Sequence, residues 1–218
     1  MENFTHCPNC DTNLKPNRFN TVVLCSETKA ALINEYLGKT SLRYCEKCGR
    51  ADYTKAYNMY IQEKNDTINK LSVLIHQVPI ITINSPFNWE YDVIDIITSQ
   101  SVMGTGVLTE ISSSFSDLFG AKSESLSQKL KDGENFCKAQ LRKQAIELGA
   151  NAIIATDIDY SEVGGAKAML MVCMSGTAIK LKNIHAIGKE RMDSINELIQ
   201  LNKRIASLHK YANLSNVL

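Results

Sequence analysis

Apolar residues recur at helical spacing in the first third of the chain. One stretch covers residues 28–37 and is followed by Gly38, a residue type that ends many helices. A longer stretch begins near Asp52, a residue type that caps helix N-termini, and continues to His76. The pattern therefore predicts two helices in this region, with a polar segment between them.

From residue 80 onward the pattern changes to short runs rich in β-branched residues. These runs predict strands over residues 80–83, 93–97, 152–160 and 167–181. The last two flank Gly164-Gly165, which predicts an antiparallel hairpin with a longer loop. A helix is predicted between the second and third strands, over residues 126–148, where Gly149 follows it.

A further helix is predicted over residues 189–212, because the apolar residues there are spaced by three and four. We expect it to pack on its own domain, with docking or self-association as the alternative, since about two heptads do not define a coiled coil. Together the elements predict an α+β fold in which a helix packs on a small antiparallel sheet. The predicted domains are an N-terminal module with a long helix (1–76), the α+β domain (77–185) and a C-terminal helical tail (186–218).

The composition is that of a globular protein without a strong charge. Of the 218 residues 44% are hydrophobic and 22% are charged, and the net charge is +1, so the chain has no strong field to attract nucleic acid or an anionic membrane. No apolar run approaches the ~20 residues of a membrane span, and residues 1–4 lack the features of a signal peptide. We therefore expect a cytoplasmic protein whose seven cysteines stay reduced and serve metal binding or burial.

Four of the cysteines form two C-x2-C pairs, a spacing typical of metal sites. Cys7 and Cys10 make one pair, Cys45 and Cys48 the other, and each pair can point two thiolates at one ion. Zinc favours four thiolates in a tetrahedron, so we predict one Zn²⁺ per chain in a zinc-ribbon or treble-clef-like module. Iron and a redox-active dithiol pair are the alternatives. Four thiolates leave no open position for water, which favours a structural role over a catalytic one.

Two neighbouring residues are not expected to bind this metal. His6 precedes Cys7 but is redundant beside four thiolates. Cys25 lies in the apolar run Val22-Val23-Leu24-Cys25, which is typical of a buried position. Both residues are therefore predicted to lie outside the coordination shell.

Four sequence blocks between residues 98 and 181 occur in an order that is more specific than any block alone. They are Ser101-Val102-Met103-Gly104, Leu148-Gly149-Ala150-Asn151-Ala152-Ile153-Ile154, Asp157-Ile158-Asp159-Tyr160, and Met169-Leu170-Met171-Val172 with Ser175-Gly176-Thr177-Ala178-Ile179. In this combination the segment resembles the YbjQ-like family, bacterial proteins described as heavy-metal-binding. The resemblance covers nearly the whole family domain and a little under half of this chain.

The resemblance implies an α+β subunit, with a helix on a small antiparallel sheet, that assembles as a homo-oligomeric ring, commonly a pentamer. Periodicity alone does not count subunits. This chain departs from the family in the predicted helix, where Gly133-Glu134 stand in place of an alanine–arginine pair. The reversed charge puts any inherited contact at that position in doubt.

Two further groups in the second domain carry candidate chemistry. Asp157 and Asp159 alternate along a predicted strand, so both carboxylates share one face, where they could bind a cation or share a proton; a solvated strand edge is the alternative. Met169, Met171 and Cys173 likewise share a face of the last strand. Three sulfur atoms suit Cu(I), but methionine and cysteine are also adaptable core residues. The sequence therefore identifies Asp157 and Asp159 as a possible second metal site.

Three functions compete on these observations. The leading hypothesis is a non-enzymatic oligomeric scaffold, in which a YbjQ-like ring presents zinc modules to an unknown protein partner. Whether the ring also binds a heavy metal is left open at this point. The second is nucleic-acid binding by the zinc module, motivated by its basic residues, which are Lys15, Arg18, Arg43, Lys47 and Arg50. The third is an enzyme that uses Asp157 and Asp159, although no partner nucleophile or base is evident.

Overall fold

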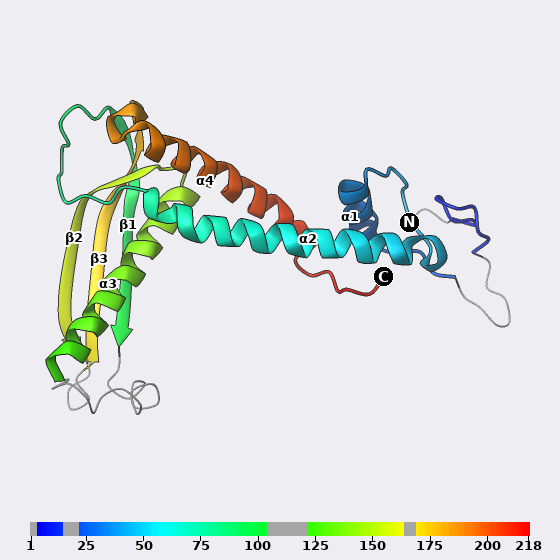
Figure 1. Ribbon diagram of the computed structural model, residues 1–218, viewed down its shortest axis with the longest axis horizontal. Coiled ribbons are helices and arrows are strands. Elements are labelled where there is room, and N and C mark those ends of the chain that lie inside the picture. Colours follow the sequence, from blue (N-terminus) through cyan, green and yellow to red (C-terminus); the bar gives the residue numbers. More distant parts are fainter. Residues whose placement is uncertain (1–3, 15–21, 104–121, 164–168) are drawn as a thin grey trace. The chain divides into compact units, whose positions relative to one another are not determined.

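The computed structural model describes residues 4–14, 22–103, 122–163 and 169–218 (Figure 1). The chain divides into two compact units. Unit 1 comprises Met1–Lys70 together with Lys203–Leu218, and unit 2 comprises Leu71–Asn202. The C-terminal residues therefore belong to the same compact unit as the N-terminal module. Each unit is described by itself below.

Unit 1 contains two of the predicted helices. Helix α1 spans Glu27–Leu37; its N-cap Ser26 accepts a hydrogen bond from the main-chain N–H of Lys29 at 3.3 Å, and Gly38 ends it with a φ of 64°. Helix α2 spans Glu46–Leu74. The expected N-cap at Asp52 is wrong, because the helix begins at Glu46, directly after Cys45 and with Cys48 in its first turn. Asp52 instead lies inside the helix and pairs with Lys39.

Tyrosines dominate the core of unit 1. Tyr44, Tyr53 and Tyr60 are buried against Leu32 and Ile33 of α1. The chain end closes this core: the Tyr53 hydroxyl donates to the main-chain oxygen of Ser215 at 2.5 Å. The remaining members of the cluster include Cys25, Ala30, Ala56, Leu208 and Tyr211. Aromatic rings bury a large area each, so a small unit gains a substantial core from them.

A charged network joins the C-terminal segment to α1 and α2. Helix α4 spans Lys189–Leu208, and its Arg204 donates to both carboxylate oxygens of Glu63, at 2.6 and 2.9 Å. Arg204 also donates to Glu35 at 2.9 Å. Glu35 accepts further hydrogen bonds from Tyr211 at 2.7 Å and pairs with Lys210 at 2.8 Å. Bidentate guanidinium–carboxylate contacts fix orientation as well as distance, so the network sets where the last helix docks.

Unit 2 is built on a three-stranded antiparallel sheet. Strands β1 (Tyr91–Met103), β2 (Ala152–Val163) and β3 (Met169–Leu181) lie in the order β1-β3-β2, so β1 and β2 are the two edges (Figure 1). Helix α3, Lys122–Glu147, packs on one face. The core between helix and sheet consists of Ile97, Cys137, Leu141, Ala145, Ala150, Ile153, Val172, Met174 and Ala178. The predicted α+β fold is confirmed, including the four-cysteine cluster before it and the helix after it.

Three details differ from the sequence prediction or lie beyond it. Residues 80–83 do not form a strand; Ile80 makes an isolated parallel bridge to Ile153 beside β2. The first strand of the sheet is longer than predicted and continues to Met103. The predicted turn at Gly164-Gly165 lies outside the described residues. Within the described part of the chain, no helix has the length and apolar character that crossing a membrane requires.

Helices α2 and α4 continue from one unit into the other. In unit 2 the two helices meet around Leu198 of α4, which is buried with Val78 and Ile146 and touched by Leu71. The apolar stripe of the C-terminal helix is therefore covered within the chain itself.

Candidate metal centre

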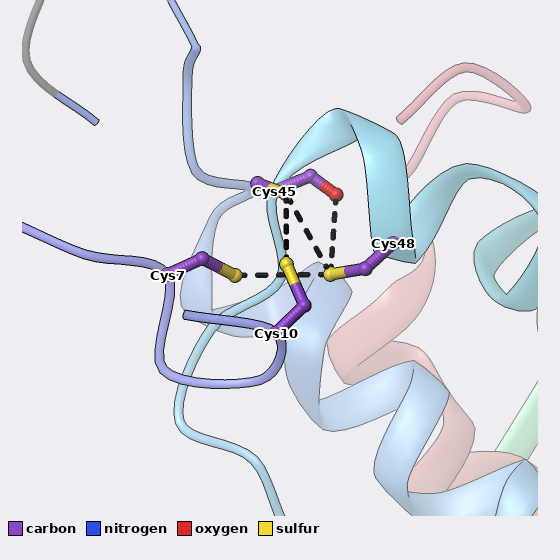
Figure 2. Close-up of side chains that lie close together, drawn as sticks. All are labelled: Cys7, Cys10, Cys45 and Cys48. Carbon is purple, nitrogen blue, oxygen red and sulfur yellow. Dashed lines mark hydrogen bonds between the residues drawn. The ribbon is translucent and has the colours of Figure 1, made fainter. Parts of the chain in front are cut away.

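The first cysteine pair sits on a tight turn held by main-chain hydrogen bonds. Cys7 donates from its main-chain N–H to the oxygen of Thr12 at 2.8 Å, and Asp11 donates to the oxygen of Cys7 at 2.9 Å. Asp11 has a φ of 57°, in the left-handed region that aspartate and asparagine tolerate better than most residues. This turn brings the side chains of Cys7 and Cys10 toward the same point, as Figure 2 shows.

The second pair occupies the N-terminal turn of α2. Cys45 immediately precedes the helix, Cys48 lies within its first turn, and the main-chain N–H of Gly49 donates to the oxygen of Cys45 at 2.8 Å. The N-terminus of a helix carries a partial positive charge, which favours thiolates over thiols there. Gly49 follows Cys48 in this turn, is buried and packs on Tyr44.

The four sulfur atoms converge on a single point, and all lie within 4.8 Å of one another (Figure 2). The Sγ–Sγ distances are 3.7 Å for Cys7–Cys48, 3.6 Å for Cys10–Cys45 and 3.7 Å for Cys45–Cys48. Four sulfurs placed tetrahedrally at about 2.3 Å from an ion are about 3.8 Å apart. A disulfide would bring two sulfurs to about 2.05 Å, so these cysteines are free thiols or metal ligands.

The four thiols have unequal surroundings. Cys7 and Cys45 are buried, Cys48 is half-buried and Cys10 is exposed. Burial raises the pKa of Cys48 to about 12, whereas the Thr12 hydroxyl, 3.1 Å from the Cys10 Sγ, lowers the pKa of Cys10 to about 6. A buried thiolate without a cation nearby is costly. A bound metal ion would offset that cost for all four, so the donor set fits a metal.

The residues excluded from the shell on sequence grounds lie apart from it. His6 is exposed, and its Nδ1 lies 3.1 Å from the hydroxyl of Thr5. Cys25 is in the tyrosine-rich core, where burial raises the pKa of its thiol. Among the described residues the four cysteines are the group of metal-ligating side chains that converges. Both zinc and iron bind four sulfur ligands in tetrahedral sites. The geometry therefore indicates a metal site but does not identify the metal.

Comparison with known proteins finds a family match for the second half of the chain. Residues 79–182 match the YbjQ_1 family model, described as "Putative heavy-metal-binding". These residues form a YbjQ-like domain. The domain lies entirely within unit 2 and contains the sheet and α3. One solved structure from Pediococcus pentosaceus is described as a protein with unknown function of the DUF74 family. Its sequence is 21% identical to this chain over the matched part. The match covers 47% of this chain and 96% of that chain, and the TM-score is 0.35.

The carboxylates proposed as a second metal site lie on the edge strand of the YbjQ-like domain. Asp157 and Asp159 are exposed, on the sheet face opposite α3, and pair across the ladder with Ser175 and Cys173. Within the described residues, no third histidine, cysteine or acidic side chain converges with them. Their role in metal binding stays a prediction.

The sulfur-bearing residues of β3 share the same face. Met169, Met171 and Cys173 are half-buried on the side of the sheet away from α3. The buried thiol of this domain is instead Cys137 of α3, whose Sγ lies 3.5 Å from the main-chain oxygen of Val172. It packs as a core residue, and burial raises its pKa.

Glu134 of α3, which departs from the family pattern, makes local contacts in this chain. Glu134 accepts a hydrogen bond from the hydroxyl of Tyr160 at 2.9 Å and pairs with Lys138 at 3.0 Å. These contacts link Glu134 to its own helix and to β2. They keep the pKa of Glu134 below its usual range, first through Lys138 and then through Tyr160.

Two of the five basic residues of the N-terminal module are engaged in contacts within the module. Arg43 donates to the main-chain oxygen of Cys25 at 2.9 Å and also pairs with Glu27. Arg50 pairs with Glu46 one turn earlier in α2. Lys15 and Arg18 lie outside the described residues. No basic stripe is visible in the part of the module that the structure describes, and nucleic-acid binding stays a prediction that the contacts do not favour.

Sequence reasoning missed the residues that support the cysteines. Thr12 both bonds the Cys10 sulfur and accepts from the Cys7 main chain, a role suggested only by its position two residues after the knuckle. Tyr44 packs under Gly49 and its hydroxyl donates to Asn34 at 2.6 Å. Lys29 donates to the main-chain oxygen of Val217 at 2.6 Å, a contact across 188 residues that local patterns do not reveal.

Proposed function

We propose that this protein is a non-enzymatic scaffold: its YbjQ-like domain assembles copies of the chain, and its N-terminal module, held by one zinc ion per chain, presents a binding surface. The observation that carries the proposal is the closed sulfur cluster. Four thiolates from segments 35 and more residues apart, at 3.6–3.7 Å, occupy every position of a tetrahedron. No position is left where a substrate or activated water could bind the ion.

Two features support a structural role for the metal. The cysteines link the N-terminal turn to α2 at the end of the tyrosine-rich core, so the ion would close a loop between Cys10 and Cys45. Metal binding to such modules supplies ~10 kcal/mol or more of folding free energy. A role in which the YbjQ-like domain binds a further heavy metal is part of the proposal only through the family's description.

The exposed surface of the YbjQ-like domain supports self-assembly. Large apolar side chains of the edge strand β1 are open to solvent, including Val93 at 66%, Ile96 at 71% and Val102 at 55% exposure. Edge strands of stable monomers are normally protected by charge, by a bulge or by a covering segment. A ring of subunits, pentameric as the family resemblance implies, would cover this edge and give the zinc modules avidity for a shared partner.

Light scattering of the zinc-loaded chain between about 1 and 50 µM tests the proposal. We expect a single mass several times that of the 24.3 kDa chain, constant across this range. A monomer at every concentration contradicts the scaffold. To test the zinc module separately, a Cys45→Ser/Cys48→Ser chain should lose bound zinc but keep the assembly, because the cysteines lie in the other unit.

A further inference from the structure

The outer edge of β2 is covered over only part of its length. The segment before β1 runs alongside it: Ile153 donates to the main-chain oxygen of Pro79 at 2.9 Å, Ile81 donates to Ile153 at 3.0 Å, and Thr156 donates to Ile81 at 3.0 Å. Beyond Thr156, no main-chain partner is found on that side of β2 among the described residues. The strand continues to Val163, so its C-terminal half is an open edge.

The outer edge of β1 is likewise blocked at one end. Ile94 is bulged out of the ladder, and the Asp95 carboxylate accepts from the main-chain N–H of Ile96 at 2.8 Å. Gln144 of α3 reaches over the edge and donates to the main-chain oxygen of Thr98 at 2.8 Å. Alternate residues of a strand point their main-chain groups to the same side. Gln100 therefore also points outward, and no described residue covers it.

The two open stretches lie at the same level of the sheet. Across the central strand, Thr98 pairs with Ser175, which pairs with Asp157. Four rows further on, Val102 pairs with Met171, which pairs with Ser161. The blocked stretches also share a level, because Ile96 and Ile154 lie in one row with Thr177 between them. Both edges are thus closed at one end of the sheet and open at the other.

We propose that residues 99–102 of β1 in one copy pair with residues 158–161 of β2 in the next copy, so that the sheets of a ring join edge to edge. Because β1 and β2 both run antiparallel to β3, they run parallel to each other, and this contact is a parallel pairing. The inference rests on the proposed assembly and specifies its interface. A contact between two different edges is heterologous and propagates from copy to copy until the rotation closes a ring.

Pairing of β1 with β2 between copies accounts for both unpaired stretches better than pairing of like edges does. Two β1 edges could pair only antiparallel about a two-fold axis, and each dimer would then keep an open β2 edge. Joining β1 to β2 leaves neither edge open in any copy. A rotation about an axis along the strands brings residues of the same level together. Because the open stretches of β1 and β2 share a level, they meet without a shift along the strands. Neither Asp95 nor residues 79–83 then enters the contact.

A proline in the β1 edge tests the interface. Gln100→Pro removes an outward N–H and places a ring in the path of a neighbour, while the ladder to β3 keeps its bonds because Gln100 points away from β3. The matched control Gln100→Thr keeps the N–H. We expect the control to retain the mass of the unaltered chain and the proline variant to sediment as a monomer at the same concentration. Trp89 fluorescence, which reports on the sheet domain, should be the same in both.

Disulfide formation identifies which edges meet. Thr98 and Asp157 of one chain are separated by β3, about 9.5 Å apart, too far for a disulfide within the chain. Under mild oxidation the double variant Thr98→Cys/Asp157→Cys should therefore give a ladder of linked chains, with peptides containing residues 98 and 157 joined. Each single variant should give no linkage through its new cysteine. A linked dimer from Thr98→Cys alone would show that like edges meet and overturn the proposal.

These outcomes separate the interface from the assembly itself. If the unaltered chain is monomeric, the proposed scaffold and the interface both fail. If the unaltered chain is oligomeric but Gln100→Pro keeps the full assembly while remaining folded, the edge pairing is wrong and the scaffold stands. If the chain is oligomeric but the double-cysteine variant gives no linked chains, the edge pairing is likewise wrong and the scaffold stands.

Discussion

At the residue scale, the metal centre depends on a few side chains around the four cysteines. The ligands themselves are predictable from the sequence, because two C-x2-C pairs carry their own geometry: each makes a turn that aims two thiolates at one point. The residues that contact and orient these cysteines cannot be predicted in the same way. Thr12 and Tyr44 are ordinary residue types at unremarkable positions, and only the folded chain brings them beside Cys10 and Gly49.

The hydroxyl of Thr12 should matter for metal affinity. It lies 3.1 Å from the Cys10 Sγ and stabilises that thiolate, so Thr12→Val removes a supporting hydrogen bond without changing the size of the side chain. Loss of such a partner costs about 10-fold in affinity or more. Competition with a chromophoric zinc chelator at neutral pH measures the change. Thr5→Val is the control, because the Thr5 hydroxyl contacts the exposed His6 and not a cysteine among the described residues, and this variant should bind zinc as the unaltered chain does.

Gly49 should be intolerant of the smallest substitution. A Cβ at this position would lie 2.7 Å from the Tyr44 Cβ and 3.2 Å from the Leu218 Cδ2. In a solvent-exposed helix position alanine is favoured over glycine by about 1 kcal/mol. Here the clash with an atom anchored to the backbone reverses the sign, and Gly49→Ala should lower the free energy of unfolding by about 1–3 kcal/mol.

Urea unfolding followed by tyrosine circular dichroism checks the Gly49 prediction, with Lys47→Ala as the exposed control in the same helical turn. A Gly49→Ala chain as stable as the control would show that Tyr44 and Leu218 do not pack on α2 as described.

At the scale of elements, the boundaries that local signals control agree with the sequence and those that tertiary contacts control do not. Ser26 and Gly38 bound α1 because cap residues act within a few positions. The start of α2 moved from Asp52 to Glu46 because the cysteine turn itself begins the helix. The run at 80–83 has strand composition but makes only an isolated bridge, because it meets β2 along an edge that it covers only in part.

The docking of α4 was beyond prediction for the same reason. Arg204 meets Glu63 across 141 residues and Glu35 across 169, and neither separation leaves a pattern in the sequence. Helical spacing predicted that residues 189–212 would be a helix with one apolar side. It could not say that the polar side would end in a network of two carboxylates, two cations and the hydroxyls of Tyr36 and Tyr211.

This network should make unit 1 sensitive to acid. Burial alone would raise the pKa of Glu35, but hydrogen bonds from Lys210, Tyr211 and Arg204 outweigh it and lower the pKa to about 2. A carboxyl group whose folded pKa is depressed contributes stability above its unfolded pKa, about 4.3, and that contribution is lost as the pH falls towards the folded value. Unit 1 should therefore lose stability progressively between pH ~4.5 and pH 2.

The variant Glu35→Gln isolates this contribution. At pH 6 it should be less stable than the unaltered chain by about 1 kcal/mol or more, and the difference should shrink as the pH falls to 4. Hydrogen exchange of α1 and α2 reports the stability of this unit, with the exposed Glu27→Gln as the control. A difference that stays constant from pH 6 to 4 would mean that Glu35 gains nothing from its ionised form.

At the scale of the whole molecule, two compact units are maintained by different means. Unit 1 relies on a tyrosine core and the sulfur cluster, and unit 2 relies on the helix-covered sheet of the YbjQ-like domain. The family resemblance was recognisable from the sequence because its blocks follow in order along one segment. The stretches of β1 and β2 that lack an outer main-chain partner among the described residues were not recognisable, because they emerge from the register of three strands.

Removing the metal should therefore unfold one unit selectively. Six of the eight tyrosines lie in unit 1, and the single tryptophan, Trp89, lies in unit 2. Because the metal supplies ~10 kcal/mol or more in such modules, a strong chelator should remove most of the near-ultraviolet tyrosine signal, leaving the part from Tyr91 and Tyr160 of unit 2, while Trp89 fluorescence stays unchanged. Readdition of zinc should restore the signal. Simultaneous loss of both signals would mean that the two units do not fold separately.

The most direct test of the account is native mass spectrometry of the full chain purified with zinc, since one spectrum reports both the number of chains and the number of metal ions. The account predicts a closed assembly of several 24.3 kDa chains with one zinc ion bound to each, and Cys7→Ser should reduce the zinc content without changing the number of chains. A monomer, or an assembly whose cysteines carry no metal, would contradict it.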